Sequence, residues 1–460
     1  MVTLTIEDLF NVPTAVIYNP DELKPVKHVA INSREVKKGS LFIAIKGKRF
    51  DGHQFVKQAV RNGAGVLLVS SRKLAMFDNV DVPVITVRNT TKALGDIAAI
   101  WRKKLKAKII GLTGSAGKTS TKEMIATILS EKYRVNKTIE NNNNHIGVPL
   151  TILSTNLKHD VLVAELGTNH FGEIEYTANI LQPDFALITN IGDSHLEFLK
   201  RRKGVLKEKA ALFDVTLKRH GKIFVNYDDP LLKSYAKKKS AVSYGFNGRP
   251  KVKGQIEKFT NDGKAVVAVK TKSKKIVNEL PVYGGQNAKN YLAAVAVADF
   301  LKLTKKEIKE GTKKLSSPDK RLKVKTYKNF LVIDDTYNAS PDSTKAAIEL
   351  VNKIKTFNRK VLVLGDMFEL GKDKIKLHRS LSSVIAKNKI DEVYSIGSGM
   401  KALNDALNKK RVVNKHFRTR KLLRKFLGEL DLNNSVILIK GSRGMRMEEF
   451  LKIIEDRVYS

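Results

Sequence analysis

The sequence has no cysteine and no apolar run long enough to cross a membrane. Without cysteine, the chain can form no disulfide bridge, thiolate metal site or cysteine nucleophile. No stretch of about 18 apolar residues is present, which excludes a membrane-spanning helix. The first ten residues include Glu7 and Asp8 and lack a basic segment followed by an apolar one, so we expect no signal peptide. These absences favour a cytoplasmic protein with no membrane insertion.

Acidic residues are also scarce, since 46 Asp and Glu stand against 85 Lys and Arg, giving a formal net charge of +39. Such a charge fits a lysine-rich solvated surface, attraction of an anionic substrate, or nucleic-acid binding. The lysines are spread along the whole chain, and aromatic residues are not interleaved with them as base stacking requires. We therefore expect no nucleic-acid partner.

The apolar residues predict an α/β fold of several domains. A chain of 460 residues with 42% hydrophobic content can bury more than one core. Short apolar runs alternate with helical stretches, which is typical of parallel sheets covered by helices. The expected strands span residues 41–45, 65–69, 84–87, 108–112, 161–164, 185–189, 223–225, 330–333, 361–364, 392–396 and 435–439. Residues 245–283 predict antiparallel strands instead, with turns at Asn247-Gly248 and at 261–263.

Three domains follow from this pattern. We predict a small N-terminal α/β domain over residues 1–88, followed by a connecting helix at 90–106. The central domain, residues 89–315, is expected to hold a P-loop-type, mostly parallel sheet. A linker at 316–319 leads to a C-terminal Rossmann-like α/β domain over residues 316–460.

The most informative stretch is the glycine-rich segment at residues 111–121. A short apolar strand runs into Gly114, Ser115, Ala116, Gly117, Lys118, Thr119 and Ser120, and an amphipathic helix follows. The segment differs from a Walker A motif because Leu112 stands where the first glycine belongs. Backbone N–H groups and a helix N-terminus bind phosphate, Lys118 can reach the β- and γ-phosphates, and Thr119 offers a hydroxyl to Mg²⁺. The sequence therefore predicts ATP use.

Further polar residues follow the other expected strands. Glu165 closes the strand at 161–164, and a carboxylate beside a phosphate loop suits Mg²⁺. His195 follows the next strand of the same sheet, where a functional role is favoured over a structural one. The segment 334–338 fits a turn cap or a nucleotide contact equally well. Basic or glycine-rich strand ends at 365–371 and 440–444 suit an anionic ligand. The residues alone predict an ATP-using enzyme without naming its substrate.

Together these sequence segments resemble the Mur ligases, the ATP-dependent amide-bond-forming enzymes of peptidoglycan synthesis. The similar strings are 32–34, 48–53, 113–121, 141–151, 334–343, 365–371 and 440–447. The C-terminal strings are most similar to the branch of the family that uses UDP-MurNAc-tripeptide and D-alanyl-D-alanine. The resemblance implies these two substrates, an acyl-phosphate intermediate, ATP, two Mg²⁺ ions and a monomeric enzyme.

The resemblance also assigns roles to individual residues. Catalytic roles fall on Lys118, His195 and Lys209, and the last is implied to be carbamylated, although composition alone favours one more surface lysine. Metal ligands are Thr119, Glu165, His195 and Lys209. The implied nucleotide site consists of Gly114, Ser115, Ala116, Gly117, Lys118, Thr119, Ser120, Asn287, Asn290, Arg321, Asp335, Tyr337 and Asn338. The implied muramoyl-substrate site consists of Ser33, Arg34, Phe50, Asp51, Gly52, His53, Thr138, Asn141, Asn143 and Asn144.

Four alternatives stay open at this point. The chain could be the Mur ligase that adds the third residue, a folate or cyanophycin-type ligase, a nucleic-acid-binding ATPase, or a non-catalytic scaffold. The intact Lys118, Thr119 and Glu165 argue against a scaffold. A nucleic-acid-binding ATPase would show nucleic-acid-stimulated turnover and steeply salt-dependent binding.

Overall fold

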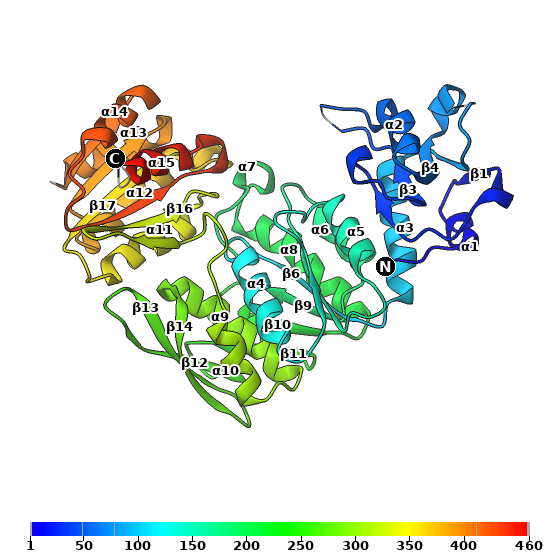
Figure 1. Ribbon diagram of the computed structural model, residues 1–460. Coiled ribbons are helices and arrows are strands. Elements are labelled where there is room, and N and C mark those ends of the chain that lie inside the picture. Colours follow the sequence, from blue (N-terminus) through cyan, green and yellow to red (C-terminus); the bar gives the residue numbers. More distant parts are fainter. Residues whose placement is uncertain (1, 48, 78, 411, 458–460) are drawn as a thin grey trace.

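The computed structural model describes residues 2–47, 49–77, 79–410 and 412–457, which form three sheets with their helices (Figure 1). The N-terminal and C-terminal sheets lie at opposite sides of a larger central unit (Figure 1). Lys48, the first residue of the 48–53 string, lies outside the described residues. Among the described residues, no helix combines the length and apolar content needed to span a membrane.

The N-terminal sheet has the strand order β1-β5-β4-β3-β2, and only the β1–β5 pair is antiparallel. Its elements are α1 (Ile6–Phe10), β1 (Val16–Tyr18), β2 (Val29–Ala30), β3 (Ser40–Ile43), α2 (Val56–Arg61), β4 (Ala64–Ser70) and β5 (Val84–Val87). Consecutive side chains of a strand point to opposite faces. Leu41 and Ile43 therefore pack into one core and Phe42 into another, so the sheet is covered on both faces.

Helix α3 (Thr90–Lys104) connects this sheet to the central unit. The Asn89 side chain accepts a hydrogen bond from Lys92 N at 2.9 Å and caps the helix. Trp101 is buried and donates to Thr155 O at 2.7 Å, which fixes α3 against the central helices α5 (Gly147–Ser154) and α6 (Glu173–Leu181). The helix predicted over 90–106 is therefore present, two residues shorter at its end.

The central sheet has the order β14-β13-β12-β11-β10-β9-β6-β8-β7. Its strands are β6 (Lys108–Thr113), β7 (Val135–Lys137), β8 (Val161–Glu165), β9 (Phe185–Ile188), β10 (Lys222–Asn226), β11 (Ala241–Gly245), β12 (Val252–Phe259), β13 (Lys264–Lys270) and β14 (Lys275–Tyr283). Strands β6 to β12 all run parallel to one another, whereas the β12–β13 and β13–β14 pairs are antiparallel. The predicted turn at 261–263 joins β12 to β13, but Asn247-Gly248 connects the parallel β11 and β12 and is no hairpin.

Helices cover both faces of the central sheet. Besides α3, α5 and α6 they are α4 (Lys118–Leu129), α7 (Leu196–Leu199), α8 (Arg202–Lys218), α9 (Gly284–Phe300) and α10 (Lys305–Lys313). Ile109 packs with residues of α3, α6 and α8, whereas Ile110 packs with residues of α4 and α9. The near-continuous apolar run of this strand is explained by burial on both faces.

The C-terminal sheet has the order β15-β16-β20-β17-β18-β19, and only β15–β16 is antiparallel. Its elements are β15 (Lys323–Thr326), β16 (Phe330–Asp335), α11 (Pro341–Lys353), β17 (Arg359–Gly365), α12 (Lys374–Lys387), β18 (Glu392–Ile396), α13 (Ser398–Asn408), β19 (Val413–Phe417), α14 (Arg420–Glu429), β20 (Ser435–Lys440) and α15 (Glu448–Asp456). Residues 316–319, predicted as linker, belong to no helix or strand. The predicted α/β class with parallel-dominated sheets is confirmed.

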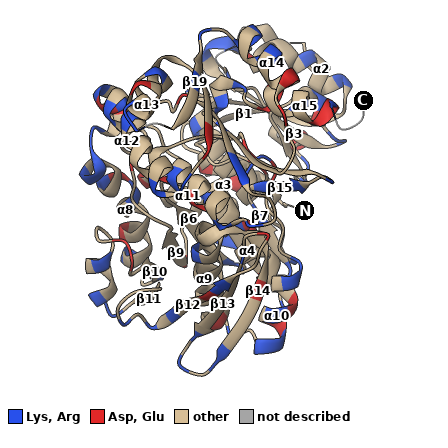
Figure 2. Ribbon diagram, turned by 90° about the vertical axis from the view of Figure 1, so that its left-hand side faces the viewer, with Lys and Arg blue, Asp and Glu red and all other residues tan. Residues whose placement is uncertain are grey.

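Lysine and arginine are distributed over all three units. Figure 2 shows them on strands, helices and loops throughout the molecule instead of in a single arm. This distribution matches the spread of basic residues along the sequence.

Candidate active site

The phosphate loop connects β6 to α4 and depends on two of its glycines. Gly117 has φ +78° and precedes the first turn of α4. A Cβ atom on Gly117 would lie 2.6 Å from Asn290 Oδ1, and one on Gly114 would lie 1.8 Å from Thr189 Oγ1. Any side chain at either position would push the loop away from its neighbours, so glycine is required there.

Residues that follow β9 hold the phosphate loop in place through hydrogen bonds. Thr189 Oγ1 and Asn190 Nδ2 both donate to Ala116 O, at 2.6 and 3.0 Å, and Asn190 Oδ1 accepts from Ala116 N at 3.0 Å. Ser115 N donates to Asn190 O at 3.1 Å. Thr189 and Asn190 were not among the predicted site residues, although polar residues directly after an apolar strand were a usable signal. Their bonds fix the loop before any ligand binds.

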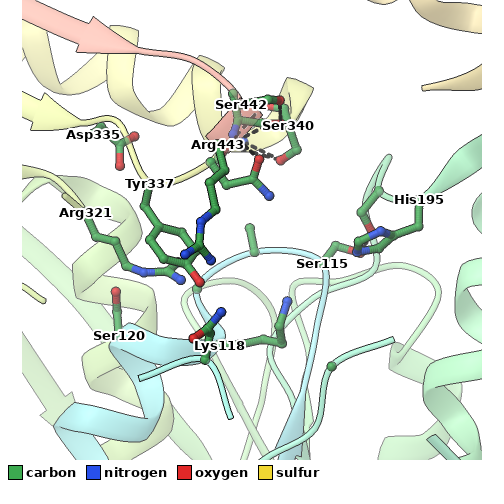
Figure 3. Close-up of a pocket in the computed structure, with 18 of the residues that line it drawn as sticks. Ser115, Lys118, Ser120, His195, Arg321, Asp335, Tyr337, Ser340, Ser442 and Arg443 are labelled. Carbon is green, nitrogen blue, oxygen red and sulfur yellow. Dashed lines mark hydrogen bonds between the residues drawn. The ribbon is translucent and has the colours of Figure 1, made fainter. Parts of the chain in front are cut away.

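A cavity of about 540 Å³ opens above this loop, between the central unit and the C-terminal sheet. Lys118 lies below it, while Tyr337, Arg321 and Arg443 approach from the opposite side (Figure 3). Lys118 Nζ donates to Gly114 O at 3.0 Å. Burial lowers the pKa of Lys118, and the nearby carboxylate of Glu165 opposes that shift. The cavity therefore contains converging cations, which suits a polyanionic ligand.

Glu165, at the end of β8, lies at the centre of a hydrogen-bonded group. Its Oε2 accepts from Thr119 Oγ1 and its Oε1 from Asn143 Nδ2, both at 2.9 Å. Its backbone N–H donates to Thr138 Oγ1 at 3.0 Å. The structure thus brings together Thr119, Glu165 and Asn143. Thr138 is fully buried, so it positions this group and does not reach a substrate.

Lys209 lies on α8 and is the most unusual side chain of the site. It is fully buried, and its Nζ has no hydrogen-bond partner among the described residues. Burial lowers the pKa of Lys209 well below its usual value, and the charge of Lys118 lowers it further. Its neighbour Glu208 is occupied, because it accepts from Gly172 N at 2.7 Å and Ile174 N at 2.8 Å. Lys209 is therefore a buried, unpartnered amine whose charged form is disfavoured, and the neutral form of an amine is the one that reacts with CO₂ to give a carbamate.

His195 has a left-handed backbone conformation, φ 52°, immediately before α7. Its Nδ1 lies 2.6 Å from Glu369 Oε2 of the C-terminal unit, without the alignment of a hydrogen bond. Burial lowers the pKa of His195, and Glu369 opposes this shift. Glu369 also lines the cavity, although only its glycine-rich segment was noted from the sequence.

The described residues contain no cluster of three or more His, Asp or Glu side chains able to hold a metal ion. Of the predicted ligands, Thr119 and Glu165 are in direct contact, and His195 lies on the same cavity as Glu165. A hydroxyl, one carboxylate and an imidazole form an incomplete set for Mg²⁺, which prefers oxygen ligands. A carbamate on Lys209 would supply the missing oxygens, so the residues fit the ion only with that modification.

The C-terminal residues form the other wall of the cavity. The Arg321 guanidinium lies 3.8 Å from the centre of the Tyr337 ring, and the Arg443 guanidinium lies 5.5 Å from it. Asp335 is less available than predicted, because Lys440 Nζ lies 2.5 Å from its Oδ2 and Leu322 N donates to its Oδ1 at 3.2 Å. Asp335 is thereby tied to the end of β20 and to the segment before β15.

Asn287, Asn290 and Asn338 line the same cavity, as predicted. Asn287 Nδ2 donates to Tyr283 O at 3.0 Å, and Asn290 Nδ2 donates to Asn287 Oδ1 at 3.2 Å. The Asn338 side chain accepts from Ala339 N at 2.9 Å. Of the predicted nucleotide residues, Ser115, Ala116, Gly117, Lys118, Ser120, Asn287, Asn290, Arg321, Asp335, Tyr337 and Asn338 all line this cavity.

The predicted muramoyl-substrate residues do not form one site. Asn141 and Asn143 line the cavity, whereas the segment 32–53 belongs to the N-terminal sheet at the far side of the molecule (Figure 1). Asn144 Oδ1 accepts from Ile146 N and Gly147 N and so stabilises the start of α5. Arg34 and Phe50 are exposed, and Ser33 is buried and donates to Gln58 Oε1 at 2.8 Å.

The side chain of His53 is occupied by contacts within the N-terminal sheet. Its Nδ1 lies 2.6 Å from Asp51 Oδ1, and its Nε2 accepts from Ser70 N at 2.9 Å. Both ring nitrogens are used and the side chain is 4% exposed, so no atom of the ring is left for a substrate. Gly52 is also structural, because a Cβ there would lie 2.7 Å from Ile45 N. These residues shape the 50–53 loop.

Three sequence profiles of one family match this chain. They are the Mur ligase family catalytic domain over residues 25–102, the Mur ligase middle domain over 112–298, and the Mur ligase glutamate ligase domain over 320–443. The chain belongs to the Mur ligase family, which confirms the resemblance seen in its motifs.

Individual relatives are similar over the full length. UDP-N-acetylmuramoyl-tripeptide–D-alanyl-D-alanine ligase of Bacillus subtilis (strain 168) is 35% identical, with 98% of each chain covered. A crystal structure of MurF from Acinetobacter baumannii is 31% identical, covers 99% of both chains and has a TM-score of 0.88. MurF from Thermotoga maritima, solved in complex with ADP, is 28% identical, covers 94% of this chain and 98% of its own, and has a TM-score of 0.82.

Proposed function

We propose that the chain joins D-alanyl-D-alanine to UDP-N-acetylmuramoyl-tripeptide with the conversion of ATP to ADP and phosphate. The observation that carries this proposal is the shared cavity. A phosphate loop contributes one wall, and segments of the C-terminal sheet that carry Arg321, Lys440 and Arg443 contribute the other. Full-length similarity to ligases named for this reaction supports the choice of substrates.

The reaction brings anions together twice. The terminal carboxylate of the tripeptide attacks the γ-phosphate, which gives an acyl phosphate and ADP. The amine of D-alanyl-D-alanine then attacks the acyl carbon, and collapse of the tetrahedral intermediate releases phosphate and leaves the amide. Lys118, Arg321 and Arg443 face the cavity and offset the repulsion between carboxylate and triphosphate.

We propose that Thr119, Glu165, His195 and a carbamylated Lys209 hold Mg²⁺. Bound there, the ion would screen the charges of the phosphate oxygens and the attacking carboxylate. The support is the contact between Thr119 and Glu165 and the buried, unpartnered amine of Lys209, whose pKa is lowered by burial. Asn143 orients the carboxylate of Glu165 from the other side.

The remaining assignments are also proposals. The units 1–88, 89–315 and 316–460 act as the UDP-binding, ATP-binding and closing domains of a cytoplasmic monomer. Arg34 and Phe50 are the exposed candidates for contact with the UDP-muramoyl part. Asn141 and Asn143 lie where the peptide end would meet the phosphate loop.

Acceptor competition tests this function. The purified protein receives ATP, Mg²⁺ and UDP-MurNAc-tripeptide, and phosphate release is compared between D-alanyl-D-alanine and single amino acids as acceptors. In a second assay, UDP-MurNAc-dipeptide replaces the tripeptide and a diamino acid is the acceptor. Release that depends on D-alanyl-D-alanine supports the proposal. Release only with a diamino acid would instead identify the ligase that adds the third residue.

A further inference from the structure

One ion-pair group crosses between the central unit and the C-terminal unit, and the reaction described above does not use it. The Arg202 guanidinium binds Asp193 with two hydrogen bonds, from Nε at 2.8 Å and from NH2 at 2.6 Å. The same NH2 lies 3.6 Å from Asp342 Oδ1. Asp193 follows β9 in the central unit and lines the cavity, whereas Asp342 lies in the first turn of α11.

The backbone opposite Asp342 is shaped for this approach. A Cβ atom on Gly192 would lie 2.2 Å from Asp342 Oδ2, so only a glycine allows the carboxylate to come so close. Gly192 is not among the described residues with a left-handed backbone, so the need for glycine is steric here. Gly192 N also donates to Ser115 Oγ at 2.9 Å, which ties the contact point directly to the phosphate loop.

An exposed ion pair usually contributes little, because ordering two long side chains offsets the attraction. Here the bidentate bond to Asp193 already orders the guanidinium, so reaching Asp342 costs little further entropy. A second contact lies nearby, where Glu197 N donates to Glu369 O at 3.1 Å. The two contacts lie on the same side of the cavity and join the 192–197 turn to the C-terminal unit.

We propose that Arg202 is a positioning residue that orients the C-terminal unit over the phosphate loop through Asp342. Held in this way, Tyr337 and Asn338, a few residues before α11, face the loop that carries Lys118. The inference rests on the proposed function in one respect: the nucleotide is shared between the two units.

The obvious alternative is that Asp342 only stabilises the N-terminus of α11. Ser340 caps this helix, Pro341 is its first residue, and an acid in the first turn interacts favourably with the helix dipole. The variant Asp342→Asn alters both roles, whereas Arg202→Gln leaves the start of α11 intact and removes the bridge together with the hydrogen bonds to Asp193. Gly192→Ala displaces the Asp342 carboxylate without changing any charge.

Domain orientation can be measured without reference to activity, because the chain has no native cysteine. The substitutions Lys158→Cys and Lys425→Cys place one dye on an exposed site of each unit. Single-molecule energy transfer is recorded for this labelled protein, for Arg202→Gln, Asp342→Asn and Gly192→Ala in the same background, and for Glu310→Gln as the control. Glu310 pairs with Lys313 within α10 and far from the bridge.

We expect the three bridge variants to shift or broaden the distance distribution, and the control to match the parent. The unlabelled variants Arg202→Gln and Asp342→Asn should each raise KM for ATP about fivefold, while kcat stays within about twofold of the parent value. The double variant should raise KM no more than either single variant does. In 0.5 M KCl the parent should approach the variants, since screening weakens exposed pairs.

Unchanged energy transfer and unchanged KM in Arg202→Gln would overturn the proposal. A melting temperature that is lowered in Asp342→Asn but not in Arg202→Gln would overturn it as well. The measurements separate a failure of the bridge from a failure of the proposed function. If the protein forms no amide but the bridge variants still alter energy transfer, the proposed function fails and the bridge stands. If ligation is intact but the distance between the two dyes is unchanged in all three variants, the bridge proposal is wrong.

Discussion

The hydroxyl of Thr119 donates a hydrogen bond of 2.9 Å to the carboxylate of Glu165. This contact joins the first turn of the helix after the phosphate loop to the end of the neighbouring strand β8. Residues 46 positions apart in the chain thus place a hydroxyl and a carboxylate side by side, next to the cavity between the central and C-terminal units.

Glu165→Gln should lower kcat for ligation by about 100-fold, because the amide keeps the shape but loses the charge that attracts Mg²⁺. The concentration of Mg²⁺ needed for half-maximal rate should rise as well. Phosphate release against Mg²⁺ concentration measures both effects. Glu175→Gln, at an exposed position of α6, is the matched control and should behave as the parent. Equal Mg²⁺ dependence in both variants would remove Glu165 from the metal site.

Lys209 should take up CO₂. The amine is buried and unpartnered, and burial lowers its pKa, which favours the neutral form that reacts with CO₂. Protein stripped of CO₂ and then given ¹³C-bicarbonate should show a carbamate carbon in its NMR spectrum and regain ligase activity. Lys209→Ala should show neither response. A carbamate signal that persists in Lys209→Ala would place the modification elsewhere.

Arg321→Ala should raise KM for ATP about tenfold with a smaller effect on kcat, because Arg321 packs on the Tyr337 ring and lines the cavity from the wall opposite Lys118. The measurement is steady-state kinetics with ATP as the varied substrate. Arg134→Ala, an exposed arginine of the central unit, provides the control. Unaltered ATP kinetics in Arg321→Ala would show that the C-terminal wall does not contact the nucleotide.

The Asp51 group should contribute stability that depends on pH. Burial raises the pKa of Asp51, but hydrogen bonds from Lys73 and His53 outweigh it and hold the pKa below the usual 3.8. A carboxylate with a lowered pKa in the folded state stabilises that state above the unfolded pKa, and this stability disappears as pH falls through the folded value.

The variant Asp51→Asn should therefore unfold about 1 kcal/mol more easily at pH 7. The difference should stay constant down to about pH 4 and shrink at lower pH. Thermal melts of both proteins between pH 3 and pH 8 test this. A difference that grows on acidification would contradict the assigned sign.

The sequence predicted the fold class because its central strands are apolar on both faces, and such runs are visible without a structure. Strands β5 and β18 coincide with the predicted ranges 84–87 and 392–396. The short strands β1, β2, β7, β11, β15 and β19 were not predicted. Most of them lie at or near sheet edges and are only partly buried, so their composition does not differ from that of loops. Strand β19, Val413–Phe417, includes three polar residues and only one buried one.

The site was predictable where backbone geometry demands particular residues and unpredictable where distant segments meet. Gly117 and Lys118 lie within one motif, and the structure places them as expected. The contact between His195 and Glu369 joins two domains, and no local pattern reports it. His53 was assigned to the substrate site because its segment resembles a UDP-binding segment, and in the structure Asp51 and Ser70 contact its two ring nitrogens.

The most direct test of the account is ADP formation by the full chain with ATP and Mg²⁺, while UDP-MurNAc-tripeptide and D-alanyl-D-alanine are omitted in turn and the product is identified by mass spectrometry. Lys118→Met serves as the inactive reference. The account predicts sustained ADP formation and UDP-MurNAc-pentapeptide only when both substrates are present. ADP formation that proceeds equally without the tripeptide, or no pentapeptide with both substrates present, would contradict the claim that the cavity couples ATP to this amide bond.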